Sequence, residues 1–160
     1  MLSLRRAVSA DVPSLVKLAY AAYGRYVARI GRPPAPMTAD YDKLVAQAEI
    51  WVTEDETELV GLLVVIENPG HLLLDNVAVI PSAQGRGIGA GLLRHAEKRA
   101  RERALAEIRL YTNAAMTENL AYYARHGYVE THRAEQDGFQ RVFFSKQLGT
   151  GGPSRVGCPT

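Results

Sequence analysis

The chain has 160 residues, 47% of them hydrophobic and 22% charged, and its 19 Lys and Arg against 17 Asp and Glu give a formal net charge of +2. These values favour a single folded domain and exclude a disordered or collagen-like chain. The small charge excess gives no support for a nucleic-acid partner, and the longest apolar stretch, residues 59–66, is far shorter than the roughly 20 residues of a membrane span, so we expect a cytoplasmic protein.

The first quarter of the chain carries mainly helical patterns. Residues 2–5 are short enough for an edge strand, and apolar residues recur at helical spacing between 15 and 26. Prolines in residues 31–36 then predict a rigid loop, because proline stops a preceding helix and fixes its own backbone angle. Residues 40–49 again carry helical spacing, which predicts a second, shorter helix.

The rest of the chain alternates strand and helix patterns. Strands are predicted by runs of β-branched or alternating apolar residues at 50–53, 59–66, 71–80, 107–112, 128–135 and 140–147. Helices are predicted at 92–103 and at 117–126, where Gly127 supplies a left-handed cap. The order favours an α/β or α+β domain with a mixed sheet over residues 1–148. The Gly- and Pro-rich segment 149–160 is expected to be a flexible tail.

Residues 84–91 read Gln-Gly-Arg-Gly-Ile-Gly-Ala-Gly, between a predicted strand and a predicted helix. The start of a helix exposes unpaired N–H groups, and glycines there let an anion approach the backbone, although the same residues would also suit a plain tight turn. A nucleoside triphosphate loop is excluded because no Lys-Ser or Lys-Thr pair follows Gly89. A dinucleotide-binding loop needs an acidic residue where the next strand ends. Thr112 occupies that position here, which makes the dinucleotide interpretation weak.

Two segments carry a family resemblance. Val77-Ala-Val-Ile-Pro81 followed by Gln84-Gly-Arg-Gly-Ile-Gly89 resembles the acyl-coenzyme A loop of the Gcn5-related N-acetyltransferase (GNAT) family, and residues 119–128 resemble that family's late helix, with a tyrosine four residues before a Gly-Tyr pair. The resemblance implies a single-domain fold whose mostly antiparallel sheet is flanked by about four helices. It also implies transfer of an acetyl group from acetyl-coenzyme A to a primary amine by direct attack in a ternary complex.

The resemblance also implies which residues bind the coenzyme. Pantetheine would pair with the backbone of Val77 and Val79. Pyrophosphate would be held by the loop backbone, with the Arg86 side chain as a further contact, so the candidate residues are Gln84, Gly85, Arg86, Gly87, Ile88, Gly89 and Ala90. The family's asparagine, seven residues before the tyrosine, is replaced by Met116, so Asn119, one turn closer, is the candidate contact.

Tyr123 matches the family's general-acid tyrosine, which protonates the leaving thiolate, although its apolar helical stripe would also suit a core residue. The attacking amine must lose a proton, and Asp75 is the first candidate base, ahead of Glu67 and His71. Tyr41 is the candidate wall of the acceptor pocket.

The acceptor class stays open among a small amine, an amino acid, a peptide N-terminus and a lysine. We expect no metal, because four dispersed His and the single Cys158 form no ligand pattern. A homodimer is compatible with the sequence, and a non-catalytic acyl-coenzyme A binding module is the alternative to an enzyme.

Overall fold

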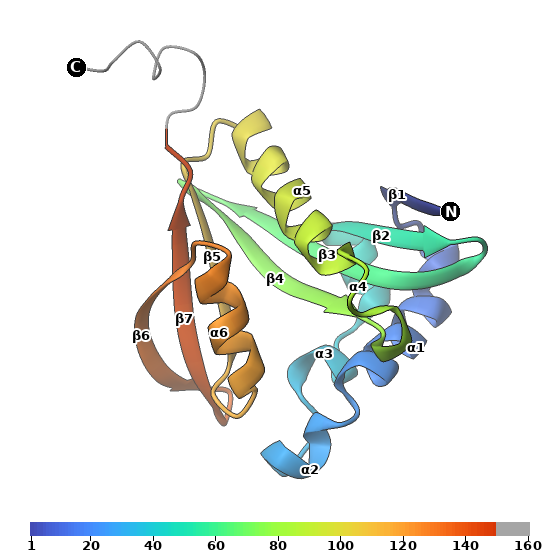
Figure 1. Ribbon diagram of the computed structural model, residues 1–160, viewed down its shortest axis with the longest axis horizontal. Coiled ribbons are helices and arrows are strands. Elements are labelled where there is room, and N and C mark those ends of the chain that lie inside the picture. The colour runs from blue at the N-terminus through green and yellow to red at the C-terminus, as the bar shows by residue number, and fades with distance from the viewer. Residues whose placement is uncertain (150–160) are drawn as a thin grey trace.

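The structure, a computed structural model, describes residues 1–149 and contains seven strands, six α-helices and two short 3₁₀ segments there (Figure 1). The strands are β1 (Leu2–Arg6), β2 (Glu49–Asp55), β3 (Glu58–Asn68), β4 (His71–Val79), β5 (Glu107–Asn113), β6 (Val129–Gln136) and β7 (Phe139–Gln147). The helices are α1 (Val12–Tyr23), α2 (Tyr26–Ile30), α3 (Ala35–Thr38), α4 (Tyr41–Gln47), α5 (Ile88–Glu102) and α6 (Thr117–Arg125), and the 3₁₀ segments are η1 (Ser9–Asp11) and η2 (Pro81–Ala83).

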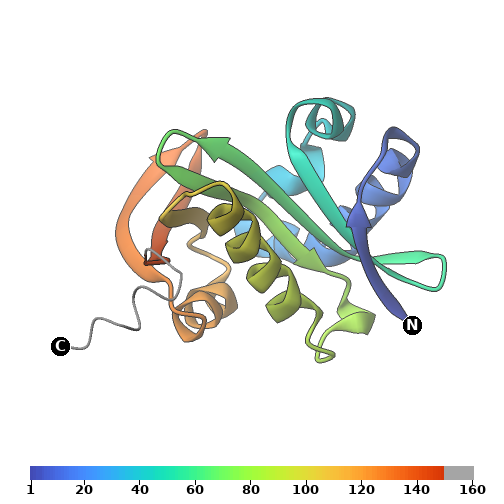
Figure 2. The same cartoon turned by 90° about the horizontal axis from the view of Figure 1, so that it is seen from above.

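All seven strands form one sheet in the order β1-β2-β3-β4-β5-β7-β6. Every neighbouring pair is antiparallel except β4 and β5, which run parallel because α5 connects them. Helices α1 and α4 cover one face of the sheet, and α5 and α6 lie on the other (Figure 2). The core between these layers is made of aliphatic side chains, with Leu62, Leu63 and Leu92 essentially inaccessible to solvent.

Strands β4 and β5 separate after three residue pairs. Their parallel register covers only Leu72 to Leu74, although β4 continues to Val79 and β5 to Asn113, and Figure 1 shows the two strands diverging. Just beyond the last pair, Asp75 is an extra residue in β4, since Val64 and Val65 of β3 oppose Asn76 and Leu74. A bulge of this kind bends a strand and increases its twist. The sheet therefore opens in the middle, where backbone groups of β4 lose a strand partner.

Helix α5 packs closely on the sheet because Gly61 of β3 has no side chain. A Cβ atom placed there would lie 2.9 Å from Cγ2 of Ile88 and 3.2 Å from Cδ1 of Leu92. This close packing fixes the first turn of α5 directly above the end of β4.

The predicted fold class, a mixed and mostly antiparallel sheet in one domain, is confirmed. The helices number six rather than about four, because the first helical stretch ends at Tyr23 and resumes as α2, and because the proline stretch contains α3. Pro36 lies in the first turn of α3, where a missing N–H costs no hydrogen bond. The predicted tail beyond Gly149 lies outside the described residues. None of the helices in residues 1–149 has the length and hydrophobicity that crossing a bilayer requires.

Candidate active site

The glycine loop forms one wall of a groove of about 430 Å³ between β4, α1, α5 and α6. Gly85 and Gly87 have φ angles of +84° and +81°, which L side chains rarely adopt, and the positions where their Cβ atoms would stand have no atom within 4 Å. α5 begins directly afterwards at Ile88, so the N–H groups of its first turn have no partner earlier in the helix. The loop therefore offers an open anion site of the kind that its sequence predicts.

The groove brings most of the predicted coenzyme residues together, namely Val77, Val79, Gln84, Gly85, Gly87, Ile88, Gly89, Ala90 and Asn119. Arg86 is the exception and does not line it. Its Nη1 atom donates to Oδ2 of Asp55 at 2.9 Å, at the hairpin between β2 and β3, so its charge is already paired.

The end of β4 presents free backbone groups to the groove. The Ile80 N–H donates to the Val60 carbonyl in β3, which places even-numbered residues toward that strand. Val77 and Val79 consequently face the other way. Their carbonyls accept hydrogen bonds from the Tyr23 hydroxyl at 3.1 Å and from Nε2 of Gln84 at 3.3 Å, rather than from a strand. Because N–H and C=O of one strand residue point to the same side, both N–H groups face the opening between β4 and β5.

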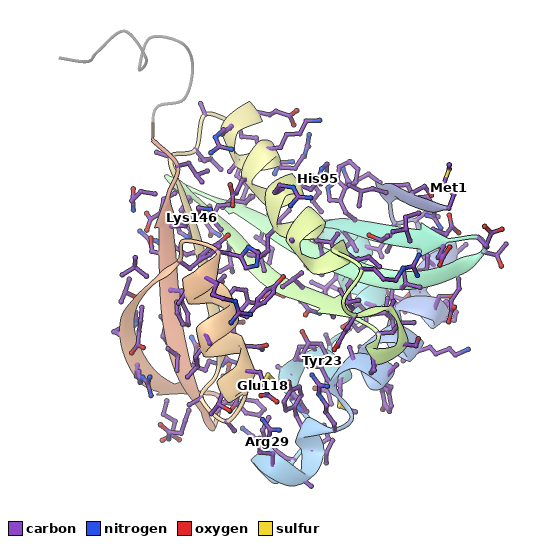
Figure 3. The ribbon with its side chains drawn as sticks, viewed as in Figure 1. Met1, Tyr23, Arg29, His95, Glu118 and Lys146 are labelled. Atoms are coloured by element: carbon purple, nitrogen blue, oxygen red, sulfur yellow. The ribbon has the colours of Figure 1, made fainter. Side chains whose placement is uncertain are left out.

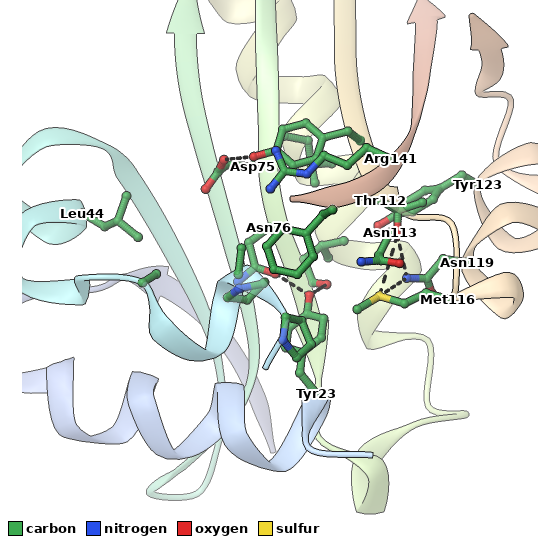
Figure 4. Close-up of a pocket in the computed structure, with 18 of the residues that line it drawn as sticks. Tyr23, Leu44, Asp75, Asn76, Thr112, Asn113, Met116, Asn119, Tyr123 and Arg141 are labelled. Carbon is green, nitrogen blue, oxygen red and sulfur yellow. Dashed lines mark hydrogen bonds between the residues drawn. The ribbon is translucent and has the colours of Figure 1, made fainter. Parts of the chain in front are cut away.

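A second, smaller cavity of about 130 Å³ lies on the α3 and α4 side of the opening (Figure 4). It and the groove share four lining residues, Tyr23, Val77, Asn119 and Tyr123. Beside the groove, Arg29 of α2 and Glu118 of α6 form an ion pair, with Nη1 and Oε1 2.7 Å apart (Figure 3). The two cavities thus meet at one place, next to the bulge in β4.

Tyr123 lies at that meeting point. The residue is 7% exposed, and its ring packs edge-on against Tyr128 and tilted against Phe144, as expected of a core residue. Its hydroxyl has no hydrogen-bond partner among residues 1–149, and burial raises the pKa of the phenol. The structure therefore combines a core ring with a hydroxyl that remains a protonated donor at neutral pH.

Asp75 lies in the small cavity, where its Oδ1 accepts a hydrogen bond of 3.3 Å from the Tyr111 hydroxyl. Burial raises the pKa of its carboxyl group above the ordinary value, against the opposing effects of Tyr111 and Arg141. The other two candidate bases lie elsewhere. Glu67 is exposed and 3.6 Å from Nε of Arg103, and His71 lines neither cavity.

Two further predicted residues make local hydrogen bonds at the cavities. Tyr41 is buried and donates to the Pro36 carbonyl at 2.6 Å, so it supports the proline segment and lines the small cavity at the same time. Burial raises the pKa of Tyr41 to about 12. Asn119 donates from Nδ2 to Oγ1 of Thr112 at 3.2 Å and borders both cavities.

Among the polar residues of the small cavity, the sequence analysis assigned no role to Asn76, Tyr111 or Arg141. Tyr23 continues the helical apolar pattern of residues 15–26, which favours packing, yet its hydroxyl lines the cavity and donates to Oδ1 of Asn76 at 2.5 Å. The polar pair of Asp75 and Asn76 inside an otherwise apolar strand was a usable signal for this site. No comparable sequence signal pointed to Arg141, because an arginine in an alternating strand is normally on the surface.

No three His, Cys, Asp or Glu side chains in the part of the chain that the structure describes gather as metal ligands would.

Comparisons with known proteins identify the family and the fold. Residues 15–128 match the model of the family described as "Acetyltransferase (GNAT) family", whereas no curated protein sequence matches. The ribosomal-protein-S18-alanine N-acetyltransferase of Escherichia coli shares the fold with a TM-score of 0.76 and 18% identity, covering 96% of this chain and 97% of that chain.

Two other similar structures contain the coenzyme. The PaiA N-acetyltransferase of Thermoplasma acidophilum, in complex with coenzyme A, has a TM-score of 0.76 at 16% identity, covering 92% of this chain and 99% of that one. A GNAT family acetyltransferase of Elizabethkingia anophelis with bound acetyl-CoA has a TM-score of 0.67 at 16% identity, with 92% and 98% covered. Since the family match spans most of the chain, including β4, the glycine loop and α6, the chain belongs to the GNAT acetyltransferase family.

Proposed function

We propose that the protein transfers the acetyl group of acetyl-coenzyme A to a primary amine by direct attack in a ternary complex. The observation that carries this proposal is the junction of the groove and the small cavity at Tyr23, Val77, Asn119 and Tyr123. A donor in the groove and an acceptor in the small cavity would meet there without a covalent intermediate on the protein. Such a placement lowers the entropic cost of bringing two reactants together.

The groove suits the shape and charge of the donor. The first-turn N–H groups of α5 and the positively charged end of its dipole would hold the pyrophosphate, and the open space above Gly85 and Gly87 gives it access to the backbone. The outward N–H groups of Val77 and Val79 would pair with pantetheine and stabilise the negative charge that develops on the thioester oxygen. Arg86 takes no part in this proposal, since its guanidinium is paired with Asp55.

The chemical step needs two proton transfers that the site can supply. The amine nitrogen forms a bond to the thioester carbonyl carbon, the carbon–sulfur bond breaks, and the sulfur leaves with the bonding electrons. Tyr123 would donate its hydroxyl proton to that sulfur, and Asp75 would accept the proton that the amine releases, directly or through one water molecule. The raised pKa of Asp75 brings it nearer to the value that an efficient general base needs.

A thermal-shift titration with acetyl-coenzyme A, coenzyme A, NADH and ATP tests the donor site. A ligand that binds only the folded state raises the melting temperature with its concentration. We expect both coenzyme A species to stabilise the wild-type protein selectively. Gly87→Glu, which adds an anion to the loop, should lose this shift.

Gly70→Glu is the matched control, because Gly70 has nearly the same φ of +83°, open space around it and a position outside both cavities. Gly70→Glu introduces the same backbone strain and the same charge, but outside the groove, so it should keep the thermal shift with the coenzyme A species. If neither coenzyme A species stabilises the wild type, the acetyltransferase proposal is wrong. Stabilisation with no release of free thiol in the presence of amines would instead favour an acyl-coenzyme A binding module.

A further inference from the structure

Arg141 is a buried cation in the wall of the small cavity. It is on β7, its residue is only 7% exposed, and it borders the same space as Asp75 and Tyr111 (Figure 4). The Cζ atom of its guanidinium lies over the Tyr111 ring, 4.3 Å from the ring centroid, and 5.5 Å from that of Phe139. A cation–π contact of this kind holds the guanidinium against the rings and leaves its N–H groups available for hydrogen bonds.

The charge of Arg141 has no close counter-ion among residues 1–149. Its Nη1 donates to the neutral side chain of Gln136. Within the described chain, the one carboxylate oxygen within 4 Å of the Arg141 side-chain nitrogens is Oδ2 of Asp137, at 3.9 Å, which is beyond hydrogen-bond distance, and the Asp137 side chain is 79% exposed. Asp75 shares the cavity but forms no ion pair with Arg141, and its Oδ1 is occupied by the Tyr111 hydroxyl. Nε and Nη2 of Arg141 have no hydrogen-bond acceptor in the described chain.

A buried guanidinium without a paired anion is costly, because burial removes the water that stabilises the charge. The geometry points to a ligand that supplies the missing anion. We propose that the acetyl acceptor is a small amino carboxylate whose carboxylate binds the free N–H edge of Arg141, an inference that rests on the proposed transfer of acetyl to an amine. A planar carboxylate matches the fork of N–H groups that a guanidinium offers.

The rest of the small cavity fits such a molecule. Its amine would lie between Asp75 and the residues shared with the groove, and its carboxylate at the Arg141 end. A volume of about 130 Å³ is close to that of an engineered protein cavity that holds benzene, so the acceptor is compact, of about six to eight non-hydrogen atoms. A peptide N-terminus carries an amide where the carboxylate is needed. A polyamine would place a second cation against Arg141.

The test compares each of a set of small amino acids with its carboxamide at saturating acetyl-coenzyme A, with thiol release as the readout. We expect kcat/KM to be about 10- to 100-fold higher for the acids, the discrimination typical of a lost charged hydrogen bond in a buried site. The amine of an amino acid carboxamide is less basic than that of the acid, so a larger fraction of it is unprotonated at the same pH. A preference for the acids therefore cannot come from a larger fraction of unprotonated amine. Equal or better use of the carboxamides would overturn the inference while leaving acetyl transfer intact.

Variants then assign the preference to Arg141. Arg141→Met should raise KM for the acids and abolish the preference, and Arg141→Lys, which keeps the charge, should restore part of it. Arg133→Gln removes an exposed arginine that pairs with Glu130 on β6 of the same hairpin, and it should change neither the KM for the acids nor the preference for them. A preference that survives in a folded Arg141→Met protein would overturn the assignment.

Titration of the same proteins with acetyl-coenzyme A separates the proposed acetyl transfer from the inference about the acceptor. The coenzyme groove does not include Arg141, so thermal stabilisation by acetyl-coenzyme A should be equal in the wild type and all three variants. Absence of this stabilisation in the wild type would defeat the proposed function itself. A different result is a wild type that is stabilised by acetyl-coenzyme A and acetylates simple amines, but acetylates neither the amino acids nor their carboxamides. That result would overturn only the amino carboxylate inference.

Discussion

The ring and the hydroxyl of Tyr123 lie in different surroundings, and the proposed function makes the hydroxyl the general acid. The ring is packed among aromatic residues, and the hydroxyl makes no hydrogen bond within the described chain. Tyr123→Phe should therefore keep the fold and coenzyme binding but lower kcat by about 10²-fold, since general acid catalysis typically contributes that much or more. Steady-state kinetics and a melting curve of the same protein measure both effects.

Tyr128→Phe is the control for the loss of a buried hydroxyl. The Tyr128 hydroxyl is also without a partner in residues 1–149, but it borders neither cavity. Its removal should leave kcat unchanged, and the melting temperature should stay level or rise, because an unpaired buried polar group destabilises the folded state. A Tyr123→Phe enzyme with wild-type kcat would mean that solvent, or another group, protonates the leaving sulfur.

Asp75 should set the acid limb of the pH–rate profile. Burial raises its pKa above 3.8, so in the wild type kcat/KM should rise with pH through that raised value, and Asp75→Asn should flatten the limb and lower the rate at pH 7 by at least 10²-fold. Glu67→Gln, which alters an exposed carboxylate outside both cavities, should keep the wild-type profile. An unaltered limb in Asp75→Asn would remove Asp75 as the base.

The same substitution should not destabilise the protein at neutral pH. A carboxyl group with a raised pKa in the folded state contributes stability below pH 3.8 and loses it as the pH rises through the folded value. At pH 7 the charged Asp75 therefore carries a penalty that asparagine lacks. Denaturant unfolding at pH 7 should give Asp75→Asn a free energy of unfolding equal to or above that of the wild type.

At the scale of elements, α5 is held at its C-terminal end by Glu49 of β2. Burial would raise the pKa of Glu49, but hydrogen bonds from Arg99, Trp51 and Arg103 outweigh it and lower the pKa to about 2. These contacts tie the last turn of the helix to the sheet. The first turn, at the glycine loop, packs on Gly61 and faces the groove.

Glu49 should make the protein sensitive to acid. Its folded pKa of about 2 lies below the ordinary 4.5, so its contribution is present above pH 4.5 and is lost as the pH falls toward 2. Glu49→Gln should lower the free energy of unfolding at pH 7 by up to roughly 3 kcal/mol, and by much less at pH 2. Urea unfolding at several pH values measures this.

Glu102→Gln is the comparison for this effect, because Glu102 also pairs with Arg99 but is 45% exposed. Exposed pairs contribute little, so its loss should change the free energy of unfolding by less than about 1 kcal/mol. A Glu49→Gln protein that unfolds like the wild type at pH 7 would show that the arginines find equivalent partners elsewhere.

At the scale of the whole molecule, the sequence predicted features that depend on neighbouring residues better than contacts between distant elements. The glycine loop and the strand before it could be predicted because positive φ angles and free helix-start N–H groups depend on neighbouring residues only. The pairing of Arg86 with Asp55, 31 residues away, depends on the hairpin between β2 and β3, which brings the two together. The positions of Tyr23 and Arg141 at the small cavity likewise depend on distant elements that meet at the opening between β4 and β5.

The bulge at Asp75 also constrains how this protein can change in evolution. One extra residue in β4 sets the alternation of everything after it, so that Val77 and Val79 turn their backbone groups outward. Losing or gaining a single residue between Leu74 and Val77 would reverse that alternation and direct those groups into β3. Side chains along this stretch can be exchanged one at a time, whereas its length is fixed, and insertions and deletions should be tolerated only outside it.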